Sequence, residues 1–177
     1  ILPSITSTKP SESKLLYKKT FFTVSEAMMT VLNNPDLYDT TQYEVLKFPI
    51  QENENFCQYL ASYLNTVGNI NCEGNTGSFK LANGVTISNI PQKAMQRQEN
   101  SSGTTVWEGV TAAEAENTLY FKVKTNNKDD NENDSDCSKR NIFKIRYSAN
   151  GKIYTTEEDQ CENSILEAGT KIQRHGE

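Results

Sequence analysis

Four aspartates lie close together in segment 126–136, which reads NNKDDNENDSD. Asp129, Asp130, Asp134 and Asp136 supply carboxylate oxygens, and the asparagines between them supply amide oxygens. Such hard oxygen donors are the ligands that Ca²⁺ prefers. The segment lacks the D-x-D-x-D-G spacing of an EF-hand loop and its closing bidentate Glu. Two interpretations stay open: a calcium site on these four aspartates, or a solvated acidic loop, which is the simpler of the two.

The four cysteines, Cys57, Cys72, Cys137 and Cys161, are the second group that could do chemistry. They lack C-x-x-C spacing, and the single histidine, His175, lies near the end of the chain, so a zinc site fits poorly. The even number predicts two disulfides and an oxidising compartment, with free buried thiols as the alternative. Of the three possible connectivities, proximity favours Cys57–Cys72 and Cys137–Cys161. In the chain-entropy model each closed loop contributes roughly 3 kcal/mol.

The sequence gives little support for a catalytic function. Ser-His-Asp and Cys-His mechanisms lack a convincing base, because the one histidine lies in a predicted tail. No two of the 23 acidic residues stand out as a glycosidase pair, and the nine glycines form no phosphate-binding loop. We therefore expect no enzyme, no catalytic or cofactor-binding residue, and no cofactor other than calcium.

The composition is polar and acidic. Of 177 residues 35% are hydrophobic, the mean hydropathy is −0.68 and the net charge is −5. This length predicts a single domain over 1–177. No basic cluster exceeds two residues, so nucleic acid is a poor partner. No run of 18 apolar residues occurs, so the sequence as given contains no membrane span.

Two helices are expected in the first third of the chain. The first covers 11–34, because apolar residues recur every three or four positions and Pro35 disfavours further helix. These residues are Leu16, Phe21, Val24, Ala27, Met28, Val31 and Leu32. Ser11 or Ser13 can cap its start. A shorter helix is predicted over 53–67, with Gly68 as its C-terminal stop.

An antiparallel sheet is predicted within 78–161, because the apolar period changes from helical to alternating. Strands are expected on both sides of Asn83-Gly84, a pair that favours a two-residue type I′ turn, and around Trp107. Further strands are expected over 118–125 and on both sides of Asn150-Gly151. Segment 92–103 is predicted to be a surface loop and 170–177 a polar tail. The order of elements predicts an α+β fold with the long helix packed on one sheet face.

In this order the elements resemble the type IV pilins and the pseudopilins of type II secretion. ILPSI followed by YKKTFFTVSEAMMTVL is similar to the point where a pilin leaves its apolar N-terminal segment. FCQYLASYLNTVGNINC with FKLANGVTI is similar to the short helix, cysteines and first strands of that family. YFKVKTNNKDDNENDSDCSKRNIFKIRYSANGKIY resembles its later strand, Asn/Asp-rich loop and hairpin region. The resemblance covers 1–161.

The resemblance implies a structural subunit of a bacterial surface filament. Its partners would be further copies of itself, other pilin-like subunits and, before assembly, the inner membrane. It would polymerise through an apolar helix ahead of residue 1, with 1–5 as the end of that helix and 1–34 as the helix's C-terminal part. The subunit would be anchored in the membrane first and extracellular afterwards.

Several points stay open on the sequence alone. The family's leader and apolar helix are not in this sequence, so no filament-forming residue is transferred. The calcium loop of major pseudopilins matches in composition but not in spacing, so that site is not transferred either. An adhesion or motility pilus is not distinguished from a secretion pseudopilus. The alternative function is a free-standing secreted binding module or adhesin, stabilised by the disulfides with or without calcium.

Overall fold

The structure, a computed structural model, describes residues 11–34, 56–73, 76–91, 97–99, 105–107, 120–147, 153–155 and 159–174. Its helices are α2 (Glu12–Leu32), α3 (Phe56–Ser62) and α5 (Gln160–Arg174), with one 3₁₀ turn, η1 (Cys137–Lys139). Its strands are β1 (Thr66–Asn71), β2 (Thr76–Leu81), β3 (Thr86–Pro91), β4 (Arg97–Glu99), β5 (Thr105–Trp107), β6 (Tyr120–Lys124), β7 (Ile142–Tyr147) and β8 (Ile153–Tyr154).

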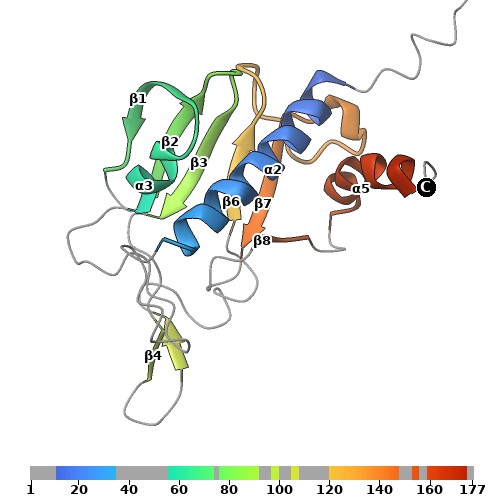
Figure 1. Cartoon of the computed structure of the whole chain (residues 1–177). Helices are drawn as coiled ribbons and strands as arrows, with labels where there is room; N and C mark the ends of the chain where they lie inside the picture. Colours follow the sequence, from blue (N-terminus) through green and yellow to red (C-terminus); the bar gives the residue numbers. More distant parts are fainter. Residues whose placement is uncertain are drawn as a thin grey trace, which may run out of the picture.

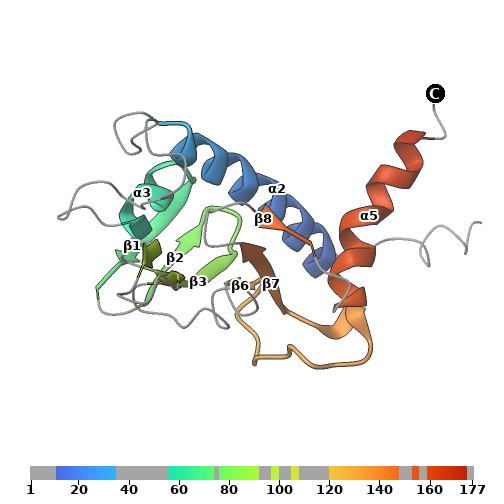
Figure 2. The same ribbon diagram turned by 90° about the horizontal axis from the view of Figure 1, so that it is seen from below.

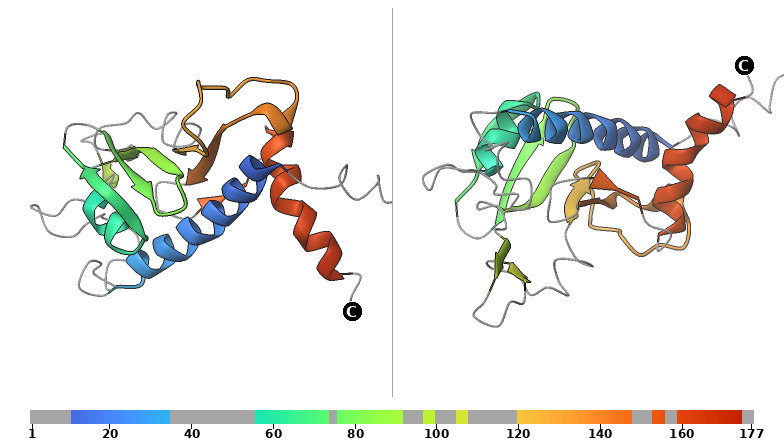
Figure 3. Two further views of the ribbon diagram at one scale, coloured as in Figure 1. Left: turned by 90° about the horizontal axis from the view of Figure 1, so that it is seen from above. Right: turned by 60° about the horizontal axis from the view of Figure 1, so that its bottom comes forward.

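Six of these strands form one antiparallel sheet in the order β1-β2-β3-β6-β7-β8. Helix α2 lies across one face of this sheet, with α3 beside it on the same face (Figures 1 and 2). α5 projects from the β7 side and crosses the beginning of α2 (Figure 3). The predicted α+β class, with a long N-terminal helix on one face of an antiparallel sheet and a short second helix, is confirmed.

Helix α2 begins and ends close to where the apolar period predicted. Ser11 is its N-cap, and the Ser11 hydroxyl accepts a hydrogen bond from the amide of Lys14 at 3.3 Å. This bond satisfies one of the amides that the first helical turn leaves unpaired. Asn33 ends the helix. Residues 1–10 and the predicted stop at Pro35 lie outside the described residues.

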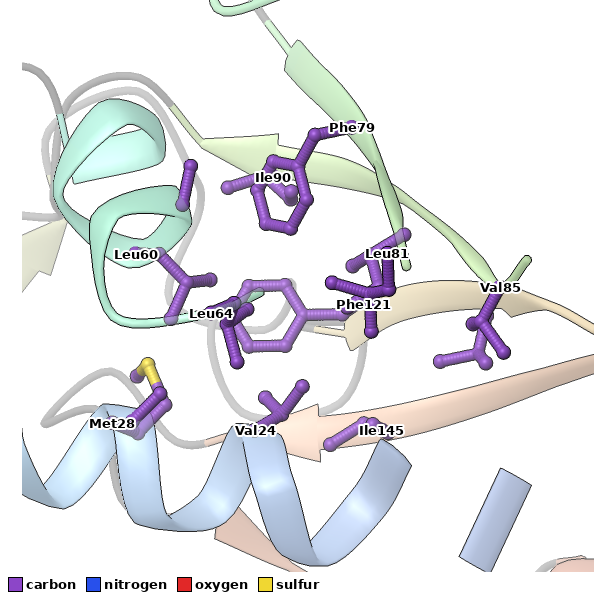
Figure 4. Packing of buried hydrophobic residues seen from close by; sticks show 14 of the residues in the cluster. Val24, Met28, Leu60, Leu64, Phe79, Leu81, Val85, Ile90, Phe121 and Ile145 are labelled. Atoms are coloured by element: carbon purple, nitrogen blue, oxygen red, sulfur yellow. The ribbon is translucent and has the colours of Figure 1, made fainter. Parts of the chain in front are cut away.

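The core lies between α2, α3 and the sheet (Figure 4). Val24 and Met28 of α2 face Phe121 of β6, and Leu60 of α3 closes the layer; all four side chains are at most 1% exposed. Phe121 stacks on Tyr147 with ring centroids 4.5 Å apart. This burial supplies the main driving force for packing the helix on the sheet.

The second helix is shorter than the sequence predicted. α3 ends at Ser62, and residues 66–67, expected to be helical, begin β1. Gly68 therefore lies inside a strand, with φ at +72°, and does not stop the helix. The apolar period predicted too long a helix because Leu64 is buried in the core although it follows the helix. Residues 53–55 lie outside the described residues.

The predicted type I′ turn at Asn83-Gly84 is wrong, although the hairpin between β2 and β3 is present. Among the described residues only Asn89, Gly68 and Gly84 have positive φ, so Asn83 does not. The Leu81 amide bonds to the Val85 carbonyl at 2.8 Å, and the Gly84 amide to the Leu81 carbonyl at 3.0 Å. The loop thus has three residues and ends on a left-handed glycine, the next most common hairpin connection.

Two segments expected to lack structure are ordered elements. Strand β4 (Arg97–Glu99), inside the predicted loop 92–103, pairs antiparallel with β5, which confirms the strand predicted at Trp107. Helix α5 continues through residues predicted as a polar tail. Its N-terminal half is fastened to the sheet by long-range contacts that local periodicity does not report. Asn150-Gly151 and His175 lie outside the described residues.

Candidate functional site

Three large apolar side chains lie in a line on the side of α2 that faces away from the sheet. They are Leu15, Phe22 and Met29, which are 53%, 50% and 61% exposed. Seven residues make almost two turns of helix, so side chains at this interval form one row along the axis. We call these three residues the apolar row.

The apolar row faces away from the sheet because a wider stripe of the same helix is buried against it. Tyr17, Val24 and Val31, which lie two residues after Leu15, Phe22 and Met29, are at most 2% exposed and face the sheet. An ordered line of exposed large side chains is typical of a protein contact surface rather than of scattered surface hydrophobics. The sequence prediction singled out the buried stripe and missed this row. The signal that could have found it is the seven-residue interval.

Within the described residues, no helix has both the length and the apolar character that a membrane span requires. In α2, polar and charged residues interrupt the apolar surface, among them Lys18, Lys19 and Glu26. The apolar row is therefore suited to contact with a surface of mixed character.

The acidic loop is ordered, and three of its four candidate aspartates bind groups of the protein itself. Asp130 pairs with Lys124 at 2.6 Å, and this hydrogen bond lowers the pKa of the Asp130 carboxyl. Asp134 accepts a hydrogen bond from the backbone amide of Asp136, which lowers its pKa. Asp136 caps η1 through Ser138, and that contact lowers the pKa of Asp136.

Asn141, which the sequence prediction did not single out, organises this loop. Its side-chain amide nitrogen donates to Asn126 Oδ1 and to the carbonyl of Asp129, each at 2.9 Å, and to the carbonyl of Lys128 at 3.4 Å. Its side-chain oxygen accepts from the backbone amide of Asn131 at 2.8 Å. One buried side-chain amide thus donates hydrogen bonds to three oxygen atoms from the first half of the loop. No local pattern in the sequence marks this role.

Asp129 differs in its contacts from the other three candidate aspartates. It lines an open polar pocket of about 680 Å³ between the start of α2 and the loop, together with Ser13, Lys139 and Arg140. Within the part of the chain that the structure describes, no three His, Cys, Asp or Glu side chains gather closely enough to hold one metal ion. The calcium site on these aspartates stays a prediction.

Both predicted disulfides are present. Cys57–Cys72 joins α3 to the end of β1, with Cα atoms 5.7 Å apart. Cys137–Cys161 joins η1 to the first turn of α5, with Cα atoms 5.6 Å apart. Proximity along the chain was therefore the correct guide to connectivity. The second bridge fixes the acidic loop and the C-terminal helix to each other.

A cluster of four charged side chains fastens α5 beside β7. Arg140 binds Asp159 through two hydrogen bonds, of 3.2 and 3.0 Å, and Arg146 binds Glu162 at 2.6 Å. Glu162 also accepts the backbone amide of Lys144 at 2.7 Å and is only 3% exposed. Two arginines and two carboxylates leave the cluster without net charge, which is the arrangement that buried charges require.

Burial and pairing shift the two carboxyl groups in opposite directions. Burial raises the pKa of Glu162, although hydrogen bonds from Arg146 and from the Lys144 amide act against it. Burial also opposes ionisation of Asp159, but there the Arg140 guanidinium and the Glu162 amide outweigh it and lower the pKa. The contacts of the charged cluster are accounted for by its role in attaching α5 to β7. The apolar row is therefore the better candidate for contacts with other molecules.

Comparisons with protein-family models, with curated proteins and with solved structures found no match for this chain.

Proposed function

We propose that this chain is the head domain of a pilin-like or pseudopilin-like subunit, which assembles with further copies into a bacterial surface filament. An apolar helix ahead of α2 would anchor the subunit in the inner membrane before assembly and would join it to other subunits afterwards. The proposal rests on the sequence resemblance and on the arrangement of α2.

The single observation that carries the proposal is the two-sided character of α2. One side packs on the sheet through Tyr17, Val24 and Met28, and the other side presents the apolar row to solvent. A head domain that worked alone would gain nothing from an ordered line of exposed apolar side chains, since such a line promotes association. A subunit in a filament needs such a line, because neighbouring copies cover it.

The rest of the head suits exposure to water outside the cell. Its surface is polar with a net charge of −5, and two disulfides hold η1, α3 and α5 in place. Disulfides of this kind persist in oxidising compartments. Polymer contacts through α2 leave the opposite face of the sheet and the acidic loop available for solvent or ligands.

The test is to isolate surface filaments from cells that make the natural full-length protein. We expect antibodies against the head to label filaments along their length in electron micrographs. We also expect mass spectrometry of the subunit to show an apolar segment of about 20 residues leading into residue 1. A protein recovered only as dispersed secreted molecules, without filaments, would contradict the proposal and favour the secreted binding module.

A matched pair of variants tests the role of the apolar row. Phe22→Asp should abolish filaments because it places a charge in the row, whereas Tyr63→Asp should leave them intact. Tyr63 is a suitable control, since it is a 40% exposed aromatic residue outside α2. Equal loss of filaments in both variants would show a general effect on the head and not a specific contact.

A further inference from the structure

The face of the main sheet that points away from α2 is basic, although the chain as a whole is acidic with a net charge of −5. The six strands of this sheet carry five charged side chains, and all of them are positive: Lys80, Lys122, Lys124, Lys144 and Arg146. They alternate along their strands with the buried residues that face α2, so all five lie on the opposite face (Figure 2).

The four lysines follow one another across this face from β7 to β2, and we call them the lysine path. Lys144 and Lys122 are direct partners on β7 and β6, and Lys124 follows Lys122 by two residues on β6. Thr86 of β3 is the partner of both Lys124 and Lys80, so it lies between them. With strands about 4.8 Å apart and about 3.3 Å per residue, successive lysines are roughly 5 to 10 Å apart at the backbone. Like charges directly opposite each other destabilise a sheet, so the path favours bound anions.

The acidic loop supplies carboxylates to the middle of the lysine path. Asp130 pairs with Lys124 at 2.6 Å, and Glu132 lies 4.0 Å from Lys122. The side chains of these two lysines are 30% and 34% exposed, so both stay accessible from solvent. The protein's own contacts thus show that carboxylates bind on this face.

The two ends of the lysine path have no such partner. Within the described residues no ion pair involves Lys80 or Lys144. The ammonium of Lys144 lies over the ring of Tyr120, 4.5 Å from its centroid. Arg146, next to the path, is bound by Glu162 in the cluster that fastens α5. The path therefore has two positive ends and a middle that the acidic loop covers in part.

We propose that the lysine path binds an acidic polysaccharide. Carboxylate or sulfate groups on the sugars bind the two end lysines and compete with Asp130 and Glu132 for the two central ones. Thr86 and Ser88, the β3 partners of Lys124 and Lys122, place hydroxyl groups beside the path, and these can hydrogen-bond to sugar hydroxyls. The inference does not depend on a filament, because contacts through α2 leave this face open in a filament subunit and in a secreted module alike.

A protein partner and a nucleic acid fit the lysine path less well. Protein interfaces are centred on buried aromatic or apolar anchors, whereas Tyr120, the aromatic residue in contact with the path, is covered by Lys144. Single-stranded nucleic acids need aromatic rings on which their bases stack, for which the same ring is not free. Duplex DNA is bound through many phosphate contacts, mostly to clustered Lys and Arg, and the path offers four cations of which two already contact carboxylates. A polyanion rich in hydroxyl groups matches the ammonium and hydroxyl groups that are present.

The direct test is to titrate the 177-residue chain, at low salt and pH 7, with polygalacturonate, heparin, neutral dextran and duplex DNA in a calorimeter. We expect polygalacturonate and heparin to bind, with an affinity that falls as salt is added, and dextran not to bind. Binding of only one of the two acidic polymers would support the proposal and identify carboxylate or sulfate as the group recognised. Absence of binding to both, or tighter binding of the DNA, would overturn the proposal.

Removing the two end lysines tests whether binding takes place on this face. We expect the double variant Lys80→Gln, Lys144→Gln to bind the acidic polymer about fivefold more weakly. The matched control is Lys18→Gln, Lys19→Gln, which removes the same net charge from α2 and should change the affinity less than about twofold. Equal losses in the two double variants would overturn the proposal, because they would show that net charge alone decides the affinity.

Freeing the two central lysines should strengthen binding. Asp130→Asn, Glu132→Gln removes the carboxylates that compete with the ligand, and we expect about fivefold tighter binding. A gain of affinity cannot result from partial unfolding, so this variant separates a binding role from a structural one. The control is Glu26→Gln, Glu167→Gln, which makes the same change in net charge at exposed positions of α2 and α5. Absence of a gain, or an equal gain in the control, would overturn this proposal and leave the proposed filament untouched.

Discussion

Tyr17 and Glu162, from opposite ends of the chain, both bind the main chain of Lys144 in β7. The Tyr17 hydroxyl donates to the carbonyl of Lys144 at 2.7 Å, and the amide of Lys144 donates to the Glu162 carboxylate at 2.7 Å. Strand β8 pairs with β7 only at Arg146 and Tyr147, so it does not reach Lys144. Two side chains thus take the place of a strand neighbour, and they keep this stretch of sheet edge from being open.

Tyr17→Phe tests the hydroxyl at this edge. It keeps the ring, which stacks on Phe143 at 4.7 Å, but leaves the Lys144 carbonyl without its donor. We expect a loss of about 1–2 kcal/mol in the free energy of unfolding, measured by urea denaturation. Tyr63→Phe, at an exposed position, should cost less than about 0.5 kcal/mol. Equal costs in the two variants would contradict this role of Tyr17.

Glu162→Gln tests the buried charge cluster. The amide still accepts from the Lys144 amide, but Arg146 loses its carboxylate partner and the cluster gains one net positive charge. Breaking a buried pair costs about 3 kcal/mol, but the burial that raises the pKa of Glu162 favours a neutral side chain and offsets part of this cost, so we expect a net loss of about 2 kcal/mol in the free energy of unfolding. The matched control is Glu167→Gln, an exposed position of the same helix. A cost below about 1 kcal/mol for Glu162→Gln would show that α5 is held by other contacts.

The stability that Asp159 contributes should depend on pH. Its pKa lies below the ordinary value of 3.8 in the folded protein, so its contribution is present above that pH. It is lost as the pH falls through the lower folded value. We expect Asp159→Asn to cost about 2 kcal/mol at pH 7 and progressively less below pH 4, measured by chemical denaturation at each pH.

Glu162 takes part in this comparison, because the Asp159 charge is one of the causes that raise the pKa of Glu162. Asp159→Asn removes that charge and so favours ionised Glu162, which lowers the cost of the substitution near neutral pH. The fall in cost below pH 4 is therefore the part of the result that reports on Asp159 itself. A difference in stability that stays constant between pH 7 and pH 3 would contradict the assignment.

Asn141→Asp tests the loop organiser and bears on calcium. The substitution keeps the oxygen that accepts from Asn131 but places a second oxygen among three oxygen acceptors. We expect a clear fall in melting temperature near neutral pH, equivalent to about 2 kcal/mol or more. Millimolar Ca²⁺ should reverse much of the fall, since a cation would replace the lost donor.

Two controls accompany this variant. Asn127→Asp adds the same charge at an exposed position of the loop and should have little effect. The unmodified protein, in which the Asn141 amide fills the space between the oxygens, should show no rise with Ca²⁺. A rise of several degrees in the unmodified protein would support the calcium site on the four aspartates.

Gly77→Ala tests the packing around the first disulfide. A Cβ at Gly77 would overlap Cys57 Sγ and lie 2.9 Å from the carbonyl of Asn71. Overpacking of this kind costs about 1–3 kcal/mol, and we expect a lower melting temperature together with slower formation of Cys57–Cys72 in non-reducing peptide maps. Gly84→Ala, where a Cβ meets no atom but φ is +90°, should lower the melting temperature without affecting the disulfide.

Local patterns in the sequence determined most of the secondary structure. The apolar period of α2, the cap at Ser11 and the alternation in β6 and β7 are properties of near neighbours along the chain. The disulfides followed because each bridge joins cysteines that are close in sequence. These features could be predicted because the forces that set them act over a few residues.

The tertiary structure decided the elements that depend on distant partners. Helix α5 has few apolar residues to mark it, and it is held by Cys137, Arg140 and β7. The order of the acidic loop could not be predicted from the loop's own sequence, because its organiser, Asn141, lies beyond it. Which side of α2 faces outward was decided by which side packs on the sheet. That choice exposed the apolar row, because burial is settled by the whole fold and not by the helix alone.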